Sequence, residues 1–237
     1  MIQNELLLPC AERVLDVFVL RPPVEQPHPT TLLIAGSGAG ADVWRFWGKR
    51  VAERGVAVVG AAQPGFGRSE GPWDFAGAPT RAAFDALLAW TKEQPWVDAG
   101  RIAFGGYSSG ATNAFLLAAR AGNAVALVGA AGVYDLSHWA RNADHPIADD
   151  ARQALAGAAD ADLRERSPVH VAAQLRCPVR LIHGGKDDVV PPEQAELMAA
   201  ALRAAGNEPD LLIYPERSHS SLASPPFVDF LAEQLKR

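Results

Sequence analysis

The sequence predicts an α/β fold, in which a mostly parallel sheet is covered by helices on both faces. Short apolar runs alternate with segments of helical periodicity along the chain, an order typical of parallel strands joined by crossover helices. Of the 237 residues, 49% are hydrophobic and 21% are charged. This composition provides a core for a single domain over residues 1–237.

Seven apolar runs are candidate strands. The run 14–22 alternates apolar and polar residues and is expected to form an antiparallel edge strand. The other six are continuous apolar runs, typical of buried parallel strands, at 30–36, 56–62, 101–107, 124–133, 178–185 and 209–216.

The segments between these runs carry helical patterns. The expected helices lie at 44–55, 80–94, 111–122, 191–206 and 225–237. The least regular stretch, 134–168, is predicted to form a small helical insert over one end of the sheet, and it is a candidate lid. No composition shift marks a second domain.

Charge and hydropathy exclude several classes of partner. The net charge is −5 and no long basic cluster occurs, so nucleic acid is not an expected partner. No apolar run approaches the ~18 residues that span a bilayer, and the N-terminus lacks the features of a secretory signal. We expect no membrane partner, a cytoplasmic location, and two buried, reduced thiols at Cys10 and Cys177. The oligomeric state is left open.

The chemistry is predicted by the pattern Gly-x-Ser-x-Gly at Gly106, Ser108 and Gly110. A strand pattern precedes it and a helix pattern follows it, which is the context that gives the motif meaning. On so sharp a turn, the residues two before and two after the serine crowd each other and must be very small. The Gly spacing selects Ser108 over its neighbour Ser109 as the nucleophile.

A serine hydroxyl needs a base within reach and a third group that orients the base. On a fold of this kind the expected chain order is Ser, then Asp or Glu, then His. The segment HGGKDDVVP follows PVRLI (178–182), and RSHSSL follows the run 209–216. Both segments come after strand ends, as the order requires.

These motifs make the chain resemble the α/β-hydrolases, and among them the stand-alone catalytic domain of the prolyl oligopeptidase and dienelactone hydrolase-like serine hydrolases. The resemblance implies a mostly parallel eight-stranded sheet without a preceding β-propeller. The group's pattern His-Gly-x-x-Asp-x-x-Val-Pro, laid on His183 to Pro191, implies that Asp187 is the catalytic acid rather than Asp188. It also implies that His219 is the base.

The chain departs from the group at three positions. The strand before the first Gly-rich loop ends in Ala35-Gly36 instead of His-Gly, and Gln63 stands where an Asp usually follows the next strand. The nucleophile is a serine, whereas dienelactone hydrolases use cysteine. Because of these departures the substrate cannot simply be inferred from that of the group, but the three triad residues are all present.

The loop 36–41 reads G-x-G-x-x-A, which is also a permitted dinucleotide-binding fingerprint. That interpretation needs an acid about 20 residues later, at the end of the next strand; Ala, Gln and Pro stand there instead. By resemblance the loop supplies an oxyanion donor, the N–H of Ser37. The N–H of Ser109, at the start of a helix, is expected to be the second donor.

The remaining polar clusters do not predict a metal site. His138, Asp144, His145, Asp149 and Asp150 gather in the insert, but they lack metal-ligand spacing. His183 lies too close to Asp187 along the chain for the usual base, and we interpret it as structural.

Several aromatic residues follow strand ends, where loops build the pocket of such folds. They are Trp44, Phe46, Trp47, Trp73, Phe75, Tyr134 and Trp139. Among the candidates for the pocket wall we favour Trp73, Trp139 and Tyr107.

The expected function is cofactor-free hydrolysis of a small carboxylic ester, a small-molecule substrate, through an acyl-enzyme. A peptidase, a thioesterase and an acyltransferase on the same triad remain open alternatives. An alternative of another class is a non-catalytic ligand-binding protein on a hydrolase scaffold.

Overall fold

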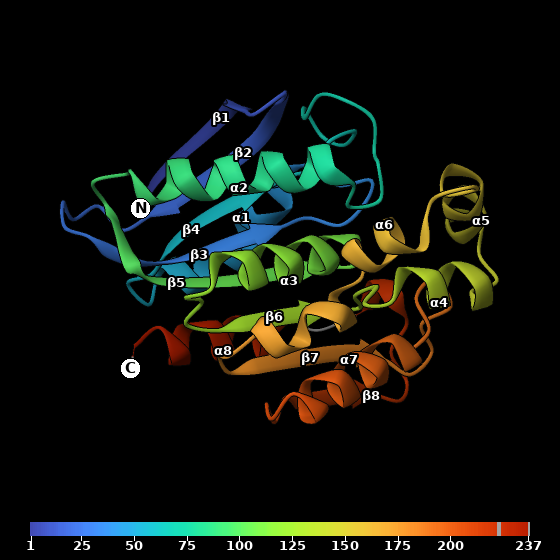
Figure 1. Ribbon diagram of the computed structural model, residues 1–237. Coiled ribbons are helices and arrows are strands. Elements are labelled where there is room, and N and C mark those ends of the chain that lie inside the picture. The colour runs from blue at the N-terminus through green and yellow to red at the C-terminus, as the bar shows by residue number, and fades with distance from the viewer. Residues whose placement is uncertain (222–223, 237) are drawn as a thin grey trace.

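An eight-stranded sheet forms the centre of the protein (Figure 1). The computed structural model describes residues 1–221 and 224–236. The strand order is β1-β2-β4-β3-β5-β6-β7-β8, and all neighbours pair in parallel except β1 with β2 and β2 with β4. The strands are β1 (Ile2–Cys10), β2 (Arg13–Arg21), β3 (His28–Ile34), β4 (Ala57–Ala61), β5 (Val97–Tyr107), β6 (Leu127–Ala130), β7 (Val179–Gly184) and β8 (Asp210–Tyr214). The predicted mostly parallel, eight-stranded α/β-hydrolase fold is confirmed.

The seven runs identified in the sequence are all strands, but the edge assignment was wrong. The strand expected at the edge is β2, and β1 pairs along its outer side. The segment of β1, IQNELLLPC, shows no clean alternation: Leu6, Leu8 and Cys10 face the core, but Leu7, which lies between two of them, is 53% exposed. An apolar residue on the exposed face, next to apolar residues on the buried face, breaks the period-two pattern by which a strand is identified.

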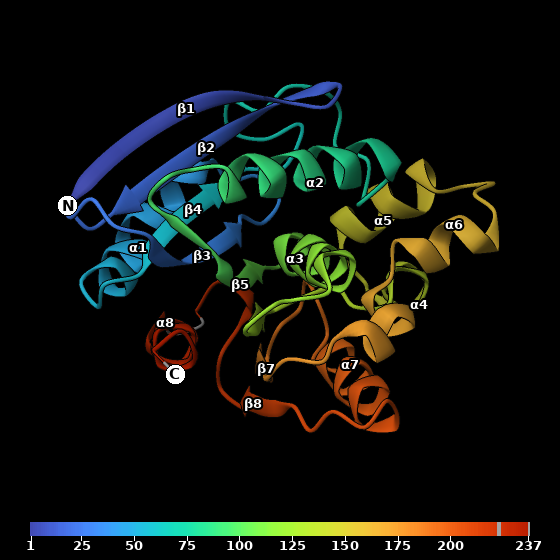
Figure 2. The same cartoon turned by 60° about the vertical axis from the view of Figure 1, so that its left-hand side comes forward.

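Five helices cover the two faces of the sheet (Figure 2). One face packs against α2 (Ala78–Lys92), α3 (Ser109–Ala121) and α7 (Glu193–Ala204), and the other against α1 (Trp44–Ala52) and α8 (Ser224–Gln234). These helices bury stripes of Ala, Leu and Phe against strands that are buried on both sides. The central strand β4, for example, has no exposed residue. This is the arrangement expected of parallel strands between helices.

The insert predicted at 134–168 contains three short helices, α4 (Leu136–Asn142), α5 (Pro146–Ala154) and α6 (Asp160–Glu165). Its apolar residues form a small core of their own. Phe75, Val133 and Val190, which come from the strand-end loops, belong to the same cluster as Trp139. The insert therefore packs over the carboxyl ends of the strands, where the parallel strands open toward a site.

Cys10 and Cys177 are free and buried, and burial raises the pKa of each thiol to about 11. Such thiols stay protonated at neutral pH and are poor nucleophiles. No helix within the described ranges is long and apolar enough to cross a membrane.

Candidate active site

The serine of the Gly-x-Ser-x-Gly motif stands on a sharp turn between β5 and α3. Ser108 has φ 54° and ψ −130°, a conformation that costs a non-glycine residue of the order of 1–2 kcal/mol. A Cβ on Gly106 would clash with the main chain of Gly110, and one on Gly110 would clash with the main chain of Ile34 and Ala35. The crowding expected from the sequence is therefore present, and the small residues permit the strained turn.

The structure brings Ser108, His219 and Asp187 together, although 111 residues separate the first two. The Nε2 of His219 lies 3.1 Å from Ser108 Oγ, and its Nδ1 lies 2.7 Å from Asp187 Oδ2. Asp187 follows β7 and His219 follows β8, so the parallel strands place both loops at the same edge of the sheet as the serine. This is the arrangement of a nucleophile, a base and an orienting acid.

Asp187 is held by four hydrogen-bond donors. Its Oδ1 accepts from the N–H groups of Val189 and Val190, and its Oδ2 accepts from His219. Burial by itself raises the pKa of Asp187, but hydrogen bonds from His183, His219 and the Val190 N–H lower it to about 2. The group is therefore a carboxylate at neutral pH and stabilises positive charge on the imidazole.

His183 lies in the protein interior next to Asp187. Its Nε2 is 2.8 Å from the carbonyl oxygen of Val190 and 3.3 Å from Asp187 Oδ2. Because a carbonyl oxygen only accepts, Nε2 must carry the proton. His183 thus donates to the acid and to its loop, which fits a structural interpretation of this residue.

Of the two predicted oxyanion donors, the N–H groups of Ser37 and Ser109, the first already donates a hydrogen bond within the protein. Ser37 N–H donates to Ser109 Oγ at 3.0 Å. A Cβ on Gly36 would lie 3.2 Å from Ser108 Cβ, so this loop passes close against the nucleophile. Ser109 is the first residue of α3, where main-chain N–H groups have no partner within the helix.

Gln63 occupies the position where the family pattern has an acid. Its Nε2 donates to Ala35 O at 2.8 Å and to Ser109 Oγ at 2.7 Å, and its Oε1 accepts from Asn113 at 2.8 Å. The amide thus ties the ends of β3 and β4 to α3 behind the nucleophile. In the sequence Gln63 is visible only as a departure from the family pattern, and the network could not be predicted because its partners lie in two segments far from Gln63, the end of β3 and the first turns of α3.

Ser108 opens into a cavity of about 590 Å³ with mostly apolar walls. The predicted wall residues Trp73, Trp139 and Tyr107 all line it. Three further aromatic candidates also line it, namely Trp44, Trp47 and Phe75. No Asp, Glu, Lys or Arg occurs among the described residues that line this cavity.

Two aromatic candidates from the sequence do not reach the cavity. Phe46 is 70% exposed on α1, and Tyr134 is fully buried in the core, where it packs edge-on against Phe115. Both follow strand ends in sequence, but the direction of each side chain depends on the local backbone.

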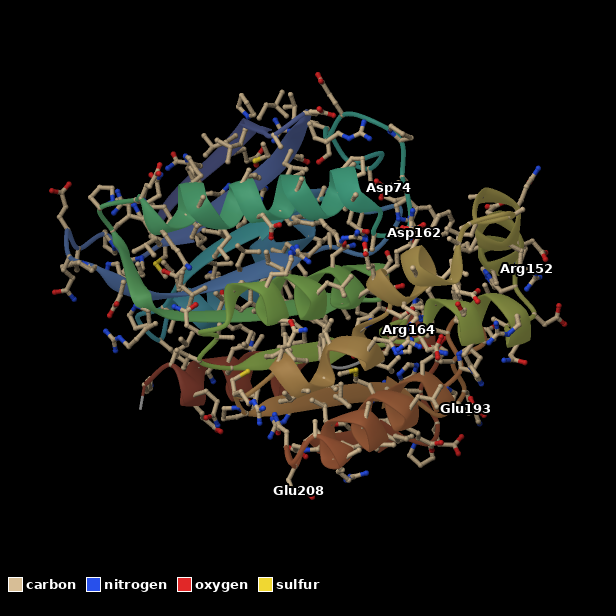
Figure 3. All side chains as sticks on the ribbon, viewed as in Figure 1. Asp74, Arg152, Asp162, Arg164, Glu193 and Glu208 are labelled. Carbon is tan, nitrogen blue, oxygen red and sulfur yellow. The ribbon has the colours of Figure 1, made fainter. Side chains whose placement is uncertain are left out.

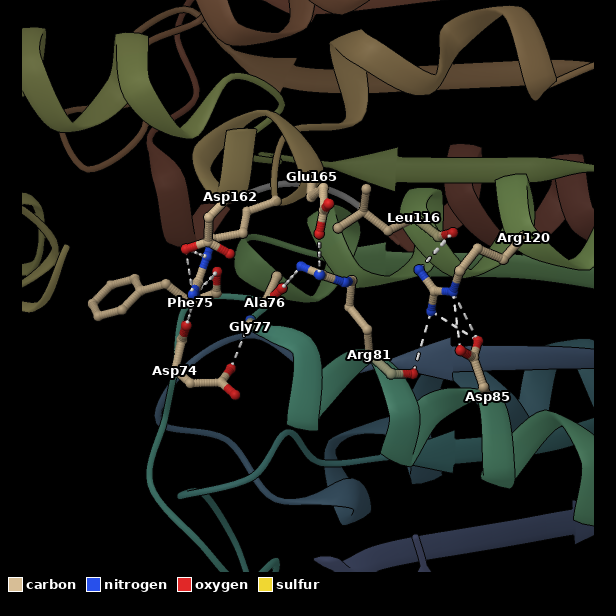
Figure 4. Close-up of polar contacts among 11 residues, drawn as sticks. Asp74, Phe75, Ala76, Gly77, Arg81, Asp85, Leu116, Arg120, Asp162 and Glu165 are labelled. Atoms are coloured by element: carbon tan, nitrogen blue, oxygen red, sulfur yellow. Dashed lines mark hydrogen bonds and ion pairs between the residues drawn. The ribbon is translucent and has the colours of Figure 1, made fainter. Parts of the chain in front are cut away.

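An arginine that follows α6 connects the insert with one wall of the cavity (Figure 4). Arg166 donates to the carbonyl oxygens of Asp74 and Phe75 and pairs with Asp162 at 2.8 Å. Phe75 and Ala76 both have positive φ, 53° and 62°. Figure 3 labels Asp74, in the loop before α2, and Asp162, in α6; Arg166 contacts both. The guanidinium group therefore holds a strained part of the wall in place.

The acidic and histidine residues of the insert are dispersed. Within residues 1–221 and 224–236, no group of three or more His, Cys, Asp or Glu side chains could hold a metal ion. His145, one member of the predicted cluster, caps α5 by accepting from Ile147 N–H at 3.2 Å, and it lines the cavity.

Comparison with known proteins identifies relatives of this arrangement. The chain is 27% identical over 158 residues to "Uncharacterized peptidase YuxL" of Bacillus subtilis, which covers 62% of this chain and 23% of that protein. It is 45% identical over 53 residues to "Putative carboxymethylenebutenolidase" of Yersinia pestis, which covers 22% of this chain and 20% of that protein. The chain thus spans less than a quarter of the length of either curated relative.

The fold is shared with solved peptidases. The acylaminoacyl peptidase of Pyrococcus horikoshii superposes with a TM-score of 0.81 and 17% identity, over 99% of this chain and 42% of that one. The sequence model of the prolyl oligopeptidase family matches residues 50–235, a range that contains Ser108, Asp187 and His219. The chain therefore belongs to the prolyl oligopeptidase family of serine-type hydrolases.

Proposed function

We propose that this chain hydrolyses a small, uncharged carboxylic ester through an acyl-enzyme. The observation that carries the proposal is the hydrogen-bonded series Ser108–His219–Asp187, in which Ser108 and His219 line an apolar cavity. Family membership supports the reaction class.

In the proposed mechanism Ser108 Oγ attacks the substrate carbonyl carbon while His219 Nε2 takes its proton. Asp187 keeps the imidazole in the orientation in which Nδ1 faces the carboxylate, and it stabilises the imidazolium that forms. His219 then protonates the departing alcohol, which leaves an acyl group on Ser108. A water molecule, deprotonated by His219, releases the acid and restores the serine.

The character of the cavity supports an uncharged substrate. A charged group placed there would lose its hydration without meeting an opposite formal charge among the described lining residues, and such burial is costly. The six aromatic side chains of the wall favour a branched or aromatic acyl or alcohol group.

A peptidase is the second candidate, favoured by the names of the relatives YuxL and the acylaminoacyl peptidase. A thioesterase or an acyltransferase would use the same triad. A non-catalytic binding protein is disfavoured because it would have no need to keep the three side chains in hydrogen-bonding register.

The test compares p-nitrophenyl esters of increasing acyl length with aminoacyl p-nitroanilides of similar size, on wild type and Ser108→Ala. We expect ester turnover that peaks at a short or aromatic acyl group and is lost in the variant. Labelling by a fluorophosphonate, mapped by mass spectrometry, is expected at Ser108. Faster cleavage of the anilides would favour the peptidase. Equal ester rates in wild type and variant would reject Ser108 as the nucleophile.

A further inference from the structure

The hydroxyl group of Ser109 already accepts two hydrogen bonds. Ser37 N–H donates to its Oγ at 3.0 Å, and Gln63 Nε2 donates to the same atom at 2.7 Å. A hydroxyl oxygen has two lone pairs and one proton. Both acceptor sites of Ser109 are therefore filled by protein donors.

The orientation of the Gln63 amide is determined by its other partners. Its Nε2 lies 2.8 Å from Ala35 O, which only accepts, so a nitrogen must face that carbonyl. Its Oε1 lies 2.8 Å from Asn113 Nδ2, which in turn also reaches Ser109 O at 3.1 Å. If the amide were turned over, its oxygen would face the Ala35 carbonyl oxygen and its nitrogen would face Asn113 Nδ2. The atom that faces Ser109 Oγ is therefore a donor.

The proton of Ser109 must then point away from both Ser37 and Gln63. Ser109 is only partly buried, and it lines the cavity beside Ser108. Within residues 1–221 and 224–236, the Ser109 hydroxyl accepts side-chain hydrogen bonds but donates none. The cavity, where the carbonyl oxygen of a substrate would sit, offers the remaining direction.

We propose that the Ser109 hydroxyl donates its proton in a hydrogen bond to the oxyanion that forms when Ser108 attacks. This assignment rests on the proposed ester hydrolysis. Ser37 N–H acts on this oxyanion through Ser109, since it holds the hydroxyl rather than the substrate, and Gln63 is a positioning residue for the same group. A hydrogen bond from a preorganised donor strengthens as negative charge develops, so it stabilises the transition state more than the bound ester.

Ser109→Ala and Ser109→Thr test the assignment on the full chain. The alanine variant removes the donor, and the threonine variant keeps a hydroxyl at the same carbon. We expect Ser109→Ala to lower kcat on a p-nitrophenyl ester by about 10²-fold with little change in KM, and Ser109→Thr to retain most of the activity. The matched control is Ser137→Ala, which deletes a hydroxyl in the first turn of α4, outside the cavity.

A second readout separates transition-state binding from a general disturbance of the site. A trifluoromethyl ketone forms a tetrahedral adduct with Ser108 and places its oxyanion where that of the substrate would form. Its inhibition constant is expected to rise in Ser109→Ala by nearly the same factor by which kcat/KM falls. Melting temperatures of all variants, measured alongside, are expected to stay within a few degrees of wild type.

The outcomes distinguish this assignment from the function on which it depends. A wild type without Ser108-dependent turnover rejects the proposed function, and the assignment fails with it. If wild type is active and Ser109→Ala is equally active or more active, the assignment is overturned but the proposed function is not. In that case the freed Ser37 N–H would serve the oxyanion directly. A fall in kcat without weaker binding of the ketone would likewise overturn it.

Discussion

The phenol group of Tyr107 donates a hydrogen bond to the main-chain carbonyl of His219, and their ring centroids lie 5.3 Å apart. Tyr107 directly precedes the nucleophile at the end of β5, whereas His219 lies in the loop after β8. Burial and the nearby carboxylate of Asp187 raise the pKa of the Tyr107 phenol, so it remains a donor at neutral pH. One side chain therefore connects the turn that carries the serine with the loop that carries the base.

Tyr107→Phe should lower kcat about fivefold, because one hydrogen bond of this kind contributes about 1 kcal/mol to the position of the His219 loop. The ring remains, so the cavity wall and KM should change little. Steady-state kinetics on the best p-nitrophenyl ester measure both parameters. Tyr214→Phe, at the end of β8, is the matched control. A tenfold rise in KM at unchanged kcat would show that the phenol acts on the substrate instead.

Asp187→Asn should reduce turnover by about 10⁴-fold, the size of loss known when a triad aspartate is replaced by its amide. The amide no longer stabilises the imidazolium, and it favours the wrong tautomer of His219. Asp188→Asn, at the exposed neighbouring position, should stay within about twofold of wild type. The two variants are compared by single-substrate kinetics, and the opposite ranking would mean that the acid is misassigned.

The same carboxylate makes the stability of the fold depend on acidity. The pKa of Asp187 is about 2 in the folded protein and about 3.9 in an unfolded chain. Its stabilising effect is therefore complete above about pH 4 and is lost as the pH falls toward 2. The difference in free energy of unfolding between wild type and Asp187→Asn should shrink by about 2 kcal/mol over that interval.

Urea titrations between pH 5 and pH 2 measure this difference, with Asp188→Asn expected to follow wild type. Parallel pH dependences for wild type and Asp187→Asn would contradict a depressed pKa at this position.

Arg166→Ala should loosen the cavity wall at Phe75 and Ala76. The guanidinium group is largely buried and holds two carbonyl oxygens next to residues with positive φ. Its loss should cost about 2 kcal/mol of stability, which a fall in melting temperature reports. KM for aromatic esters should rise several-fold, with a smaller effect on acetyl esters that do not reach this wall.

Arg164→Ala, an exposed substitution in the same helix, provides the control and should change neither quantity. Equal rises in KM for aromatic and acetyl esters would show that Arg166 does not act through this wall.

Local patterns predicted seven of the strands in order and the five helices that cover the sheet, and they select Ser108 as the candidate nucleophile. Buried parallel strands must be apolar throughout, and the turn at Ser108 admits only very small residues at Gly106 and Gly110, so both features are visible along the chain. The strand β1 was missed because the exposed Leu7 stands between the core-facing Leu6 and Leu8 and hides the alternation. The acid and the base were assigned through resemblance to a family, because the number of residues between two loops does not tell how far apart they lie in space.

The sequence by itself therefore determined the architecture and the kinds of group available for chemistry, because periodicity and glycine placement follow from local geometry. Only the tertiary structure decided which groups meet. In the structure Tyr134 lies in the core and Phe75 lines the cavity, and the N–H of Ser37 donates to Ser109 instead of facing the open site. The physical reason is that hydrogen bonds such as those of Gln63 join segments distant in sequence, and their partners are set by packing, which no local pattern contains.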